Sequence, residues 1–208
     1  MSIPEKVINR LTMYHFILED VHEKYISSTK FANLLDIDNS QVRKDLKYID
    51  NQGKCRVGYE VKTLKHKIEE CLGFKKTRDV FIVGAGNLGS ALAKYDSFKD
   101  YGLNVIAMFD KDPKKIGMVI NGKEVFDISR VGNLAQRLGV ETAILTVPRE
   151  HAQGAANYLA GVGIKYIWNF TTCVLDVPNC VRVWNENLIG SFLQFTNRDE
   201  VTENSNDN

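Results

Sequence analysis

Residues 80–89 read Val-Phe-Ile-Val-Gly-Ala-Gly-Asn-Leu-Gly, and this stretch decides the fold of the chain that follows. Four apolar residues of a buried strand run directly into a Gly-x-Gly-x-x-Gly loop, and a helical pattern from Leu88 to Lys94 begins inside that loop. Gly84 permits the sharp turn, Gly86 leaves room for a pyrophosphate, and Gly89 lets the helix approach the strand. The order of strand, loop and helix therefore predicts a dinucleotide-binding turn, with Ala85, Asn87 and Leu88 as further loop contacts.

An acidic residue follows at the distance that such a site uses. Asp110 lies 21 residues after Gly89, at the end of a second apolar run, Val105–Phe109. A carboxylate there accepts hydrogen bonds from ribose hydroxyls and repels a 2′-phosphate, so we expect NAD(H) rather than NADP(H). The alternative is a glycine-rich turn without a ligand and an aspartate placed by chance.

Two later apolar runs, 143–147 and 166–170, complete a strand–helix alternation with a helical segment between them, Glu150–Leu159. Apolar runs without period-two alternation are typical of a parallel sheet covered on both faces. Ligands of such sheets bind at the carboxyl ends of the strands. Further cofactor contacts are therefore expected at Lys115 and Gly117 near the adenine, and at Thr146, Val147 and Pro148, although this proline could equally do no more than end its strand.

The first 76 residues have a different organisation. Apolar spacing indicates one helix in the first 21 residues, a second from the Ser27-Ser28 cap, and a third over about residues 39–49. A glycine-punctuated stretch, residues 53–61, reads as a hairpin, and a helix over residues 62–72 follows it. This order is typical of a winged helix-turn-helix.

The third helix places Val42, Leu46 and Ile49 on one face and polar residues outward. Arg and Lys can bind guanine edges or phosphates, and Gln can pair with adenine. Residues 1–78 hold 15 Lys and Arg against 11 Asp and Glu, which also favours an anionic partner. The alternative is a solvated charged helix in a protein-interaction domain. The DNA-binding candidates are Ser40, Gln41, Arg43, Lys44, Lys47 and Tyr48 in the helix, and Lys54, Arg56 and Tyr59 in the hairpin.

A dinucleotide fold most often belongs to a dehydrogenase, but the residues favour binding without turnover. Hydride transfer needs a placed acid or base. Three histidines precede the nucleotide domain, His151 lies in an expected surface helix, and Tyr95 is more naturally an aromatic that closes a pocket. Two rival classes stay open: an NAD-dependent oxidoreductase with a fused regulatory domain, and a CoA-binding interaction module.

Composition places the chain in the cytoplasm. Hydrophobic residues make up 44% of the sequence, the net charge is +1, and no apolar run approaches the roughly 18 residues of a membrane span. The four cysteines lack zinc-ligand spacing, so we expect no metal site. We expect all four to be reduced, with a Cys173–Cys180 disulfide as the alternative.

Several of these motifs together resemble Rex, the bacterial redox-sensing repressors, over about residues 3–195. The shared motifs are Gln41–Leu46, Val57–Tyr59, Gly84–Gly89, Phe109–Gly117, Ala143–Pro148 and Asn169-Phe170. The resemblance implies a homodimer on a palindromic operator, released when NADH displaces NAD⁺. It also implies four parts: a winged-helix domain (1–76), a Rossmann NAD(H)-binding domain (77–184), a domain-swapped dimerisation helix (185–196) and a disordered tail (197–208).

The resemblance further implies a redox switch. It places Tyr95, Asn169, Phe170 and Thr171 near the nicotinamide, and it makes Leu188 and Phe192 part of the swapped helix. In the family an aspartate that starts this helix pairs with an arginine and a tyrosine, which Arg10 and Tyr95 match here. This chain has Asn187 at the aspartate position, so an ion pair cannot form. It also has Arg56 where the family's hairpin has a glycine, which adds a cation at the tip.

Overall fold

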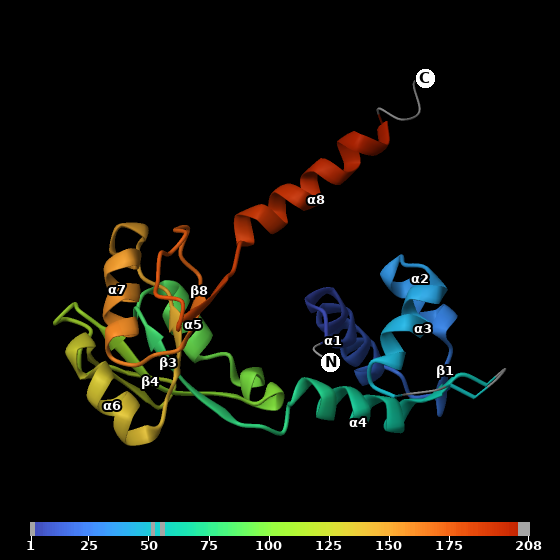
Figure 1. Ribbon diagram of the computed structural model, residues 1–208, viewed down its shortest axis with the longest axis horizontal. Helices are drawn as coiled ribbons and strands as arrows, with labels where there is room; N and C mark the ends of the chain where they lie inside the picture. The colour runs from blue at the N-terminus through green and yellow to red at the C-terminus, as the bar shows by residue number, and fades with distance from the viewer. Residues whose placement is uncertain (1–2, 51–52, 55–56, 204–208) are drawn as a thin grey trace. The chain divides into compact units, whose positions relative to one another are not determined.

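The computed structural model describes residues 3–50, 53–54 and 57–203 (Figure 1). The chain divides into two compact units, Met1–Lys76 and Thr77–Asn208, and each is described by itself. No helix in the described part of the chain is long and apolar enough to cross a membrane.

The first unit is a small helical domain. It contains α1 (Glu5–Glu19), β1 (Tyr25–Ile26), α2 (Ser28–Leu35), α3 (Asn39–Lys47), β2 (Tyr59–Glu60) and α4 (Val61–Leu72). Ser27 caps α2 by accepting a hydrogen bond from the Lys30 N–H at 3.1 Å, and Asp38 caps α3 through the Ser40 N–H at 2.6 Å. The Ser27 cap lies where the sequence predicted the start of α2, and the turn between α2 and α3 runs from Asp36, which is left-handed, to the Asp38 cap.

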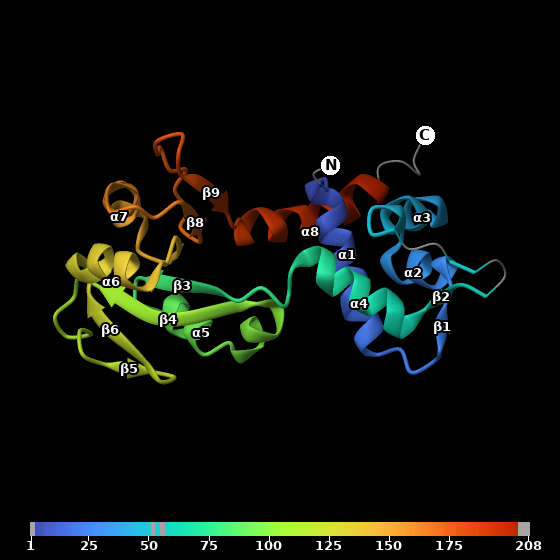
Figure 2. The same ribbon diagram turned by 60° about the horizontal axis from the view of Figure 1, so that its bottom comes forward.

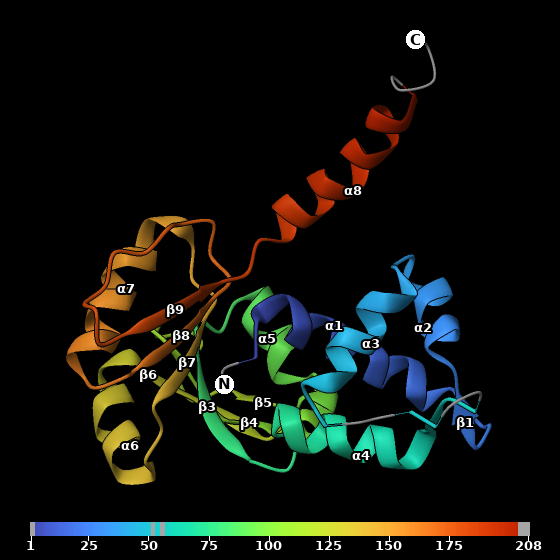
Figure 3. The ribbon, with the colours of Figure 1, turned by 45° about the vertical axis from the view of Figure 1, so that its right-hand side comes forward.

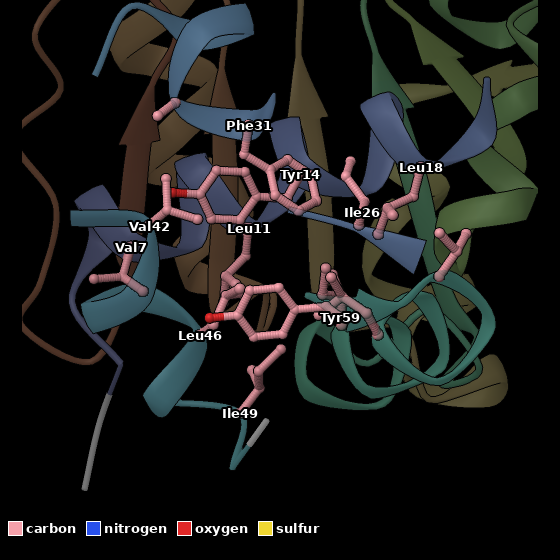
Figure 4. Close-up of a cluster of buried hydrophobic side chains, with 14 residues drawn as sticks. Val7, Leu11, Tyr14, Leu18, Ile26, Phe31, Val42, Leu46, Ile49 and Tyr59 are labelled. Atoms are coloured by element: carbon pink, nitrogen blue, oxygen red, sulfur yellow. The ribbon is translucent and has the colours of Figure 1, made fainter. Parts of the chain in front are cut away.

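The helices of the first unit enclose one core (Figure 4). Leu11 and Tyr14 of α1, Phe31 of α2, Leu46 of α3 and Leu64 of α4 are all fully buried. Each comes from the inward face of its helix, so hydrophobic burial holds α3 against the other three helices. The face of α3 that carries the basic residues is left outside this core.

The hairpin differs from its prediction. Within the described residues, Lys54 and Gly58 form a single antiparallel bridge, and β2 pairs with β1, which precedes α2. A side chain at Gly58, where φ is +99°, would collide with the Ile26 carbonyl. Arg56 and Cys55, which the sequence places at the tip, lie outside the described residues.

The second unit is built on a seven-stranded sheet in the order β5-β6-β4-β3-β7-β8-β9. The strands are β3 (Arg78–Val83), β4 (Leu103–Asp110), β5 (Val119–Ile120), β6 (Lys123–Asp127), β7 (Thr142–Leu145), β8 (Tyr166–Asn169) and β9 (Arg182–Asn185). The four predicted strands are the central ones, and they pair in parallel as expected. The prediction missed β5, β6 and β9, and β5 runs antiparallel to β6. Figure 3 shows β3, β7, β8 and β9 side by side.

Helices cover both faces of the sheet (Figure 2). α6 (Val131–Leu138) and α7 (Arg149–Gly161) pack on the face that carries Phe81 and Phe109. α5 (Asn87–Ala93) and the 3-10 helix η1 (Asp96–Tyr101) pack on the face that carries Ile82. A second 3-10 helix, η2 (Ile128–Arg130), precedes α6. Double coverage explains why the central strands are apolar on both sides.

The last helix, α8 (Leu188–Glu203), corrects the prediction for the tail. We expected disorder from Asn197, but the backbone stays helical through Glu203, and residues 204–208 lie outside the described part. Asn187 accepts a hydrogen bond from the Gly190 N–H at 2.8 Å and so caps the helix. Leu188, Ile189 and Phe192 are each about 60% exposed.

Candidate functional site: a dinucleotide cleft and a nucleic-acid interface

The glycine loop lies where the sheet reverses its strand order. β3 sits between β4 and β7, so the loop after β3 opens at the crevice where α/β folds bind ligands. Gly84 has a φ of +106°, and a Cβ at this position would lie 2.8 Å from the carbonyl of Thr146. The Thr146 hydroxyl donates to the Gly84 carbonyl at 2.8 Å, which fixes the loop to the end of β7.

The other two glycines make the space that the motif needs. A Cβ on Gly89 would collide with the Gly84 carbonyl, so α5 can approach the strand only with glycine here. A Cβ on Gly86 would meet nothing within 4 Å. The space beside Gly86 faces the N-terminus of α5, whose free N–H groups favour an anion. This geometry fits a pyrophosphate.

Asp110 closes the loop from the end of β4. Its carboxylate is only 10% exposed and accepts hydrogen bonds from the Ala85 N–H at 2.8 Å, the Asp112 N–H at 2.9 Å and the Lys115 Nζ at 2.9 Å. Burial alone would raise the pKa of this carboxyl, but these three donors outweigh burial and hold the pKa below its ordinary value. Asp110 is therefore an anion that both shapes the loop and faces the cleft.

A cavity of about 810 Å³ opens at this crevice, which is within the range of cofactor sites. Half of the predicted cofactor residues line it: Gly84, Gly86, Asn87, Asp110, Lys115, Thr146, Val147 and Pro148. The cavity extends to the first turns of α7, so it is bounded by this helix and by the segments that follow β3, β4 and β7.

Sequence reasoning missed one wall of this cavity. Phe109, Ile128, His151, Ala155 and Tyr158 also line it. The His151 Nε2 lies 2.8 Å from the Lys111 Nζ at the opening. α7 starts directly after Pro148, so the end of β7 could have indicated that its first turns face the cleft.

The remaining predicted cofactor residues lie outside the lining of this cavity, within the described part of the chain. Ala85 is buried and contributes its N–H to Asp110, Gly89 serves packing, and Leu88 is 37% exposed. Gly117 is a turn residue with a φ of +85°. Tyr95 is 57% exposed, and its ring lies 4.9 Å from that of Phe98.

Asn169, which was predicted to contact the cofactor, builds the loop after β8 in this structure. It is fully buried, its amide donates to the Cys173 carbonyl and to Asn185 at 2.8 Å, and its oxygen accepts from the N–H and hydroxyl of Thr171. These bonds hold the segment after β8, in which the ring of Phe170 packs at 4.8 Å from Trp168. Asn169 thus positions Phe170 and Thr171.

Most of the residues predicted to bind nucleic acid are exposed in the structure. Ser40, Arg43, Lys44, Lys47, Tyr48 and Lys54 are exposed on α3 and the hairpin. Arg43 donates to the Ser28 hydroxyl at 3.5 Å. The assignment of Tyr59 is wrong, because this side chain is 8% exposed and packs in the core beside Ile49 (Figure 4).

Gln41 also differs from its prediction as a fully outward residue. It is half-buried, and its Nε2 donates to the Oδ1 of Asp45 at 2.8 Å. Asp45 is fully buried and also accepts from Tyr14 at 2.7 Å and from Arg10 at 2.6 and 2.8 Å. Arg10, which the resemblance links to the switch, is therefore paired within its own domain here.

Two other predictions concern the chemistry of the cysteines and of metal binding. Cys71, Cys173 and Cys180 are free cysteines, so the Cys173–Cys180 disulfide does not form here. Over the described ranges, no three His, Cys, Asp or Glu side chains gather as a metal site requires.

Comparison with known proteins shows two matching families. Residues 75–173 match the family described as CoA binding domain, and residues 2–47 match a putative DNA-binding protein N-terminus. The redox-sensing transcriptional repressor Rex of Treponema denticola is 42% identical over 188 residues, which cover 89% of this chain and 90% of that relative. Rex 2 of Thermotoga maritima is 38% identical, over 93% of this chain and 94% of its own length.

Solved structures show the same likeness. The crystal structure of RSP in complex with β-NAD⁺ and operator DNA superposes with a TM-score of 0.87 at 34% identity, covering 99% of this chain and 98% of that chain. RSP in complex with β-NADH superposes with a TM-score of 0.86 at 35% identity, covering 98% and 97%. A third structure is described as RSP, a Rex-family repressor, with a TM-score of 0.85.

Proposed function

This chain belongs to the Rex family of redox-sensing transcriptional repressors, and we propose that it binds a palindromic operator as a homodimer and leaves it when NADH binds. The family resemblance inferred from the motifs is confirmed by these relatives. Their names also confirm a repressor rather than an oxidoreductase. Because such a protein acts where the DNA is, we propose that it is cytoplasmic.

The observation that carries the proposal is a dinucleotide crevice in the same chain as an exposed basic helix. Gly86 leaves space for a pyrophosphate before α5, and Asp110 presents a buried carboxylate where a ribose hydroxyl would lie. Bound nicotinamide would supply the signal, because its ring is cationic in NAD⁺ and neutral in NADH. Tyr95, Phe170 and Thr171 would form the apolar surroundings that disfavour the charged ring.

On the DNA side, the exposed Arg43, Lys44, Lys47 and Tyr48 of α3 would enter the major groove. Lys54 of the hairpin would neutralise a phosphate. Two copies of α3 must then lie about one helical turn of DNA apart, roughly 34–36 Å, in the state that binds the operator. NADH releases the operator by favouring a dimer in which this distance differs, because only differential affinity shifts such an equilibrium.

The dimer itself would be made by α8. Leu188, Ile189 and Phe192 expose apolar surface at helical spacing, and an exposed apolar face of this kind marks an interaction site. The family membership assigns the second copy of the chain as its partner. We propose that the swapped segment is residues 185–196, in which Asn187 caps α8 without supplying the negative charge of the family's aspartate.

The test is a gel-shift titration at fixed salt, since salt alone alters affinity for DNA steeply. The duplex is an operator selected by the wild-type chain from a random pool. NADH should release the duplex, and NAD⁺ should oppose that release. Asp110→Ala is the matched control: it should bind the duplex equally well and resist release. Operator affinity that does not change with NADH would refute the proposal.

A second ligand is favoured by one specific observation, the match of residues 75–173 to the CoA binding domain family. CoA and NADH share an adenosine and a pyrophosphate, so either could use the Gly84–Gly89 loop. Competition between CoA and NADH in a fluorescence titration would decide between them. Loss of NADH binding on addition of CoA would support the CoA-binding class, and unchanged NADH binding would exclude CoA from this loop.

A further inference from the structure

The carboxylate of Asp45 uses all of its hydrogen-bonding capacity inside the first unit. Oδ2 accepts from the Arg10 Nε at 2.6 Å and from the Tyr14 hydroxyl at 2.7 Å. Oδ1 accepts from the Arg10 Nη2 and from the Gln41 Nε2, both at 2.8 Å. A carboxylate offers about four lone-pair positions, so Asp45 is filled and fixed.

Burial makes this arrangement rigid. Asp45 is 0% exposed and the Arg10 side chain is 25% exposed, so the pair is held where a free charge would be costly. Burial alone would raise the pKa of Asp45, but donation from Arg10, Tyr14 and Gln41 outweighs it, and the pKa lies below its ordinary value. The carboxylate therefore stays charged and keeps its four donors.

We propose that Asp45 is a positioning residue that fixes the side-chain amide of Gln41 for reading adenine in the operator. This inference rests on the proposed function, since it needs α3 in the major groove. Gln41 lies in the first turn of α3, and N-terminal residues of a recognition helix contact base edges.

The orientation of the amide follows from the charge of Asp45. With Nε2 donating one hydrogen to Asp45, the amide cannot turn over, because Oε1 would then face a buried carboxylate oxygen. Gln41 keeps one acceptor, Oε1, and one N–H for DNA. Adenine presents the complementary pair in the major groove, an N6 donor beside the N7 acceptor. Arg10 contributes by holding Asp45 through both carboxylate oxygens.

The experiment measures base preference at each position of an operator selected by the wild-type chain. Gln41→Ala should lose discrimination for adenine at one symmetric pair of positions by about 5- to 150-fold. Asp45→Asn should lose discrimination at the same positions. The double variant should lose no more than Gln41→Ala, because Asp45 acts through Gln41.

Tyr14→Phe is the matched control. It removes one donor to Asp45 but leaves the bonds to Arg10 and Gln41, so thermal stability should fall while base preference stays unchanged. The inference is overturned if Asp45→Asn keeps the adenine preference, if its loss is equal at every position, or if Gln41→Ala prefers the same bases as wild type.

If Asp45→Asn does not fold, a measurement on the wild-type chain tests the inference instead. In the wild-type NMR spectrum, the Gln41 side-chain amide, identified by its absence in Gln41→Ala, should show one hydrogen protected from exchange and one free. Two equally exchanging hydrogens would overturn the inference. If the wild-type chain selects no operator at all, the proposed function fails instead, and the two failures are distinct.

Discussion

At the residue scale, Gly86 and Gly89 lie three positions apart but have different roles: Gly89 allows close packing, and Gly86 leaves open space. Gly89→Ala places a methyl group against the Gly84 carbonyl and should cost about 1–3 kcal/mol in the free energy of unfolding, as overpacking does. Gly86→Ala places it in open space, so stability should hold while NADH binding weakens. Thermal unfolding and NADH titration of both variants check this. Equal loss of stability in the two would contradict it.

The stability that Asp110 contributes to the fold should depend on pH. Its pKa is lowered in the folded chain, so its contribution to stability is present above its ordinary value of 3.8 and is lost as the pH falls below that value. Asp110→Asn should therefore be less stable than wild type at pH 7, and the difference should be smaller at pH 3, because part of the contribution of the carboxylate is lost once the pH lies below 3.8. Urea unfolding at both pH values measures this. A constant difference would mean that the ion pair with Lys115 contributes nothing.

The residues that could be predicted from the sequence are those that belong to a short motif, because all parts of the pattern lie close together along the chain. The Gly84–Gly89 loop and Asp110 form one short pattern with a known spacing. Asp45 gave no such signal, because its partner Arg10 lies 35 residues away and the two meet only after α1 and α3 pack. Tyr59 was misassigned for the same reason: a tyrosine beside basic residues suggests DNA, and only the tertiary core shows that it is buried.

At the scale of elements, long apolar strands were predictable and short edge strands were not. β3, β4 and β7 are largely buried on both faces and β8 is half-buried, so their apolar runs are visible in the sequence. β6 reads Lys-Glu-Val-Phe-Asp, and β5 and β1 have two residues each, too few for a pattern. The tail was misjudged because polar residues beyond Asn197 can still extend a helix that starts with apolar ones.

Residues of α3 and of the hairpin should contribute to DNA binding in different ways. Arg43 is exposed on this helix and lies one turn before Lys47. If Arg43 binds a base edge, Arg43→Ala should cost about 1–3 kcal/mol in operator binding and relax specificity at one position. Lys54→Ala, on the hairpin, should instead weaken binding to all duplexes alike and reduce the salt dependence. Binding measured at three salt concentrations separates the two effects.

The apolar face of α8 should be required for the chain to form a dimer. Phe192 is 62% exposed at the centre of its apolar face. Phe192→Ser should convert the dimer to a monomer without unfolding either unit, because the side chain takes no part in their cores. Sedimentation equilibrium measures the mass, and circular dichroism checks the fold. A dimer that persists would place the interface elsewhere.

At the scale of the whole molecule, two binding sites in separate units must share one equilibrium. Each unit has its own core, so neither ligand can act on the other through packing within one unit. In the proposed dimer, the coupling would come from the arrangement of the two chains, which sets the distance between the α3 helices. If Asn187 takes the place of the family's aspartate in this proposed coupling, it supplies a hydrogen-bonding amide and no charge.

Binding of NADH and binding of operator DNA should affect each other equally. If NADH lowers operator affinity by some factor, operator DNA must lower NADH affinity by the same factor, typically about 5- to 150-fold. Fluorescence titration of NADH, with and without saturating operator duplex, measures one factor, and the gel shift measures the other. Phe192→Ser serves as the control: the monomer should bind NADH with one affinity whether or not the duplex is present. If the wild-type dimer bound NADH with the same affinity whether or not the duplex is present, NADH and DNA would not be coupled and the two-state dimer would be excluded.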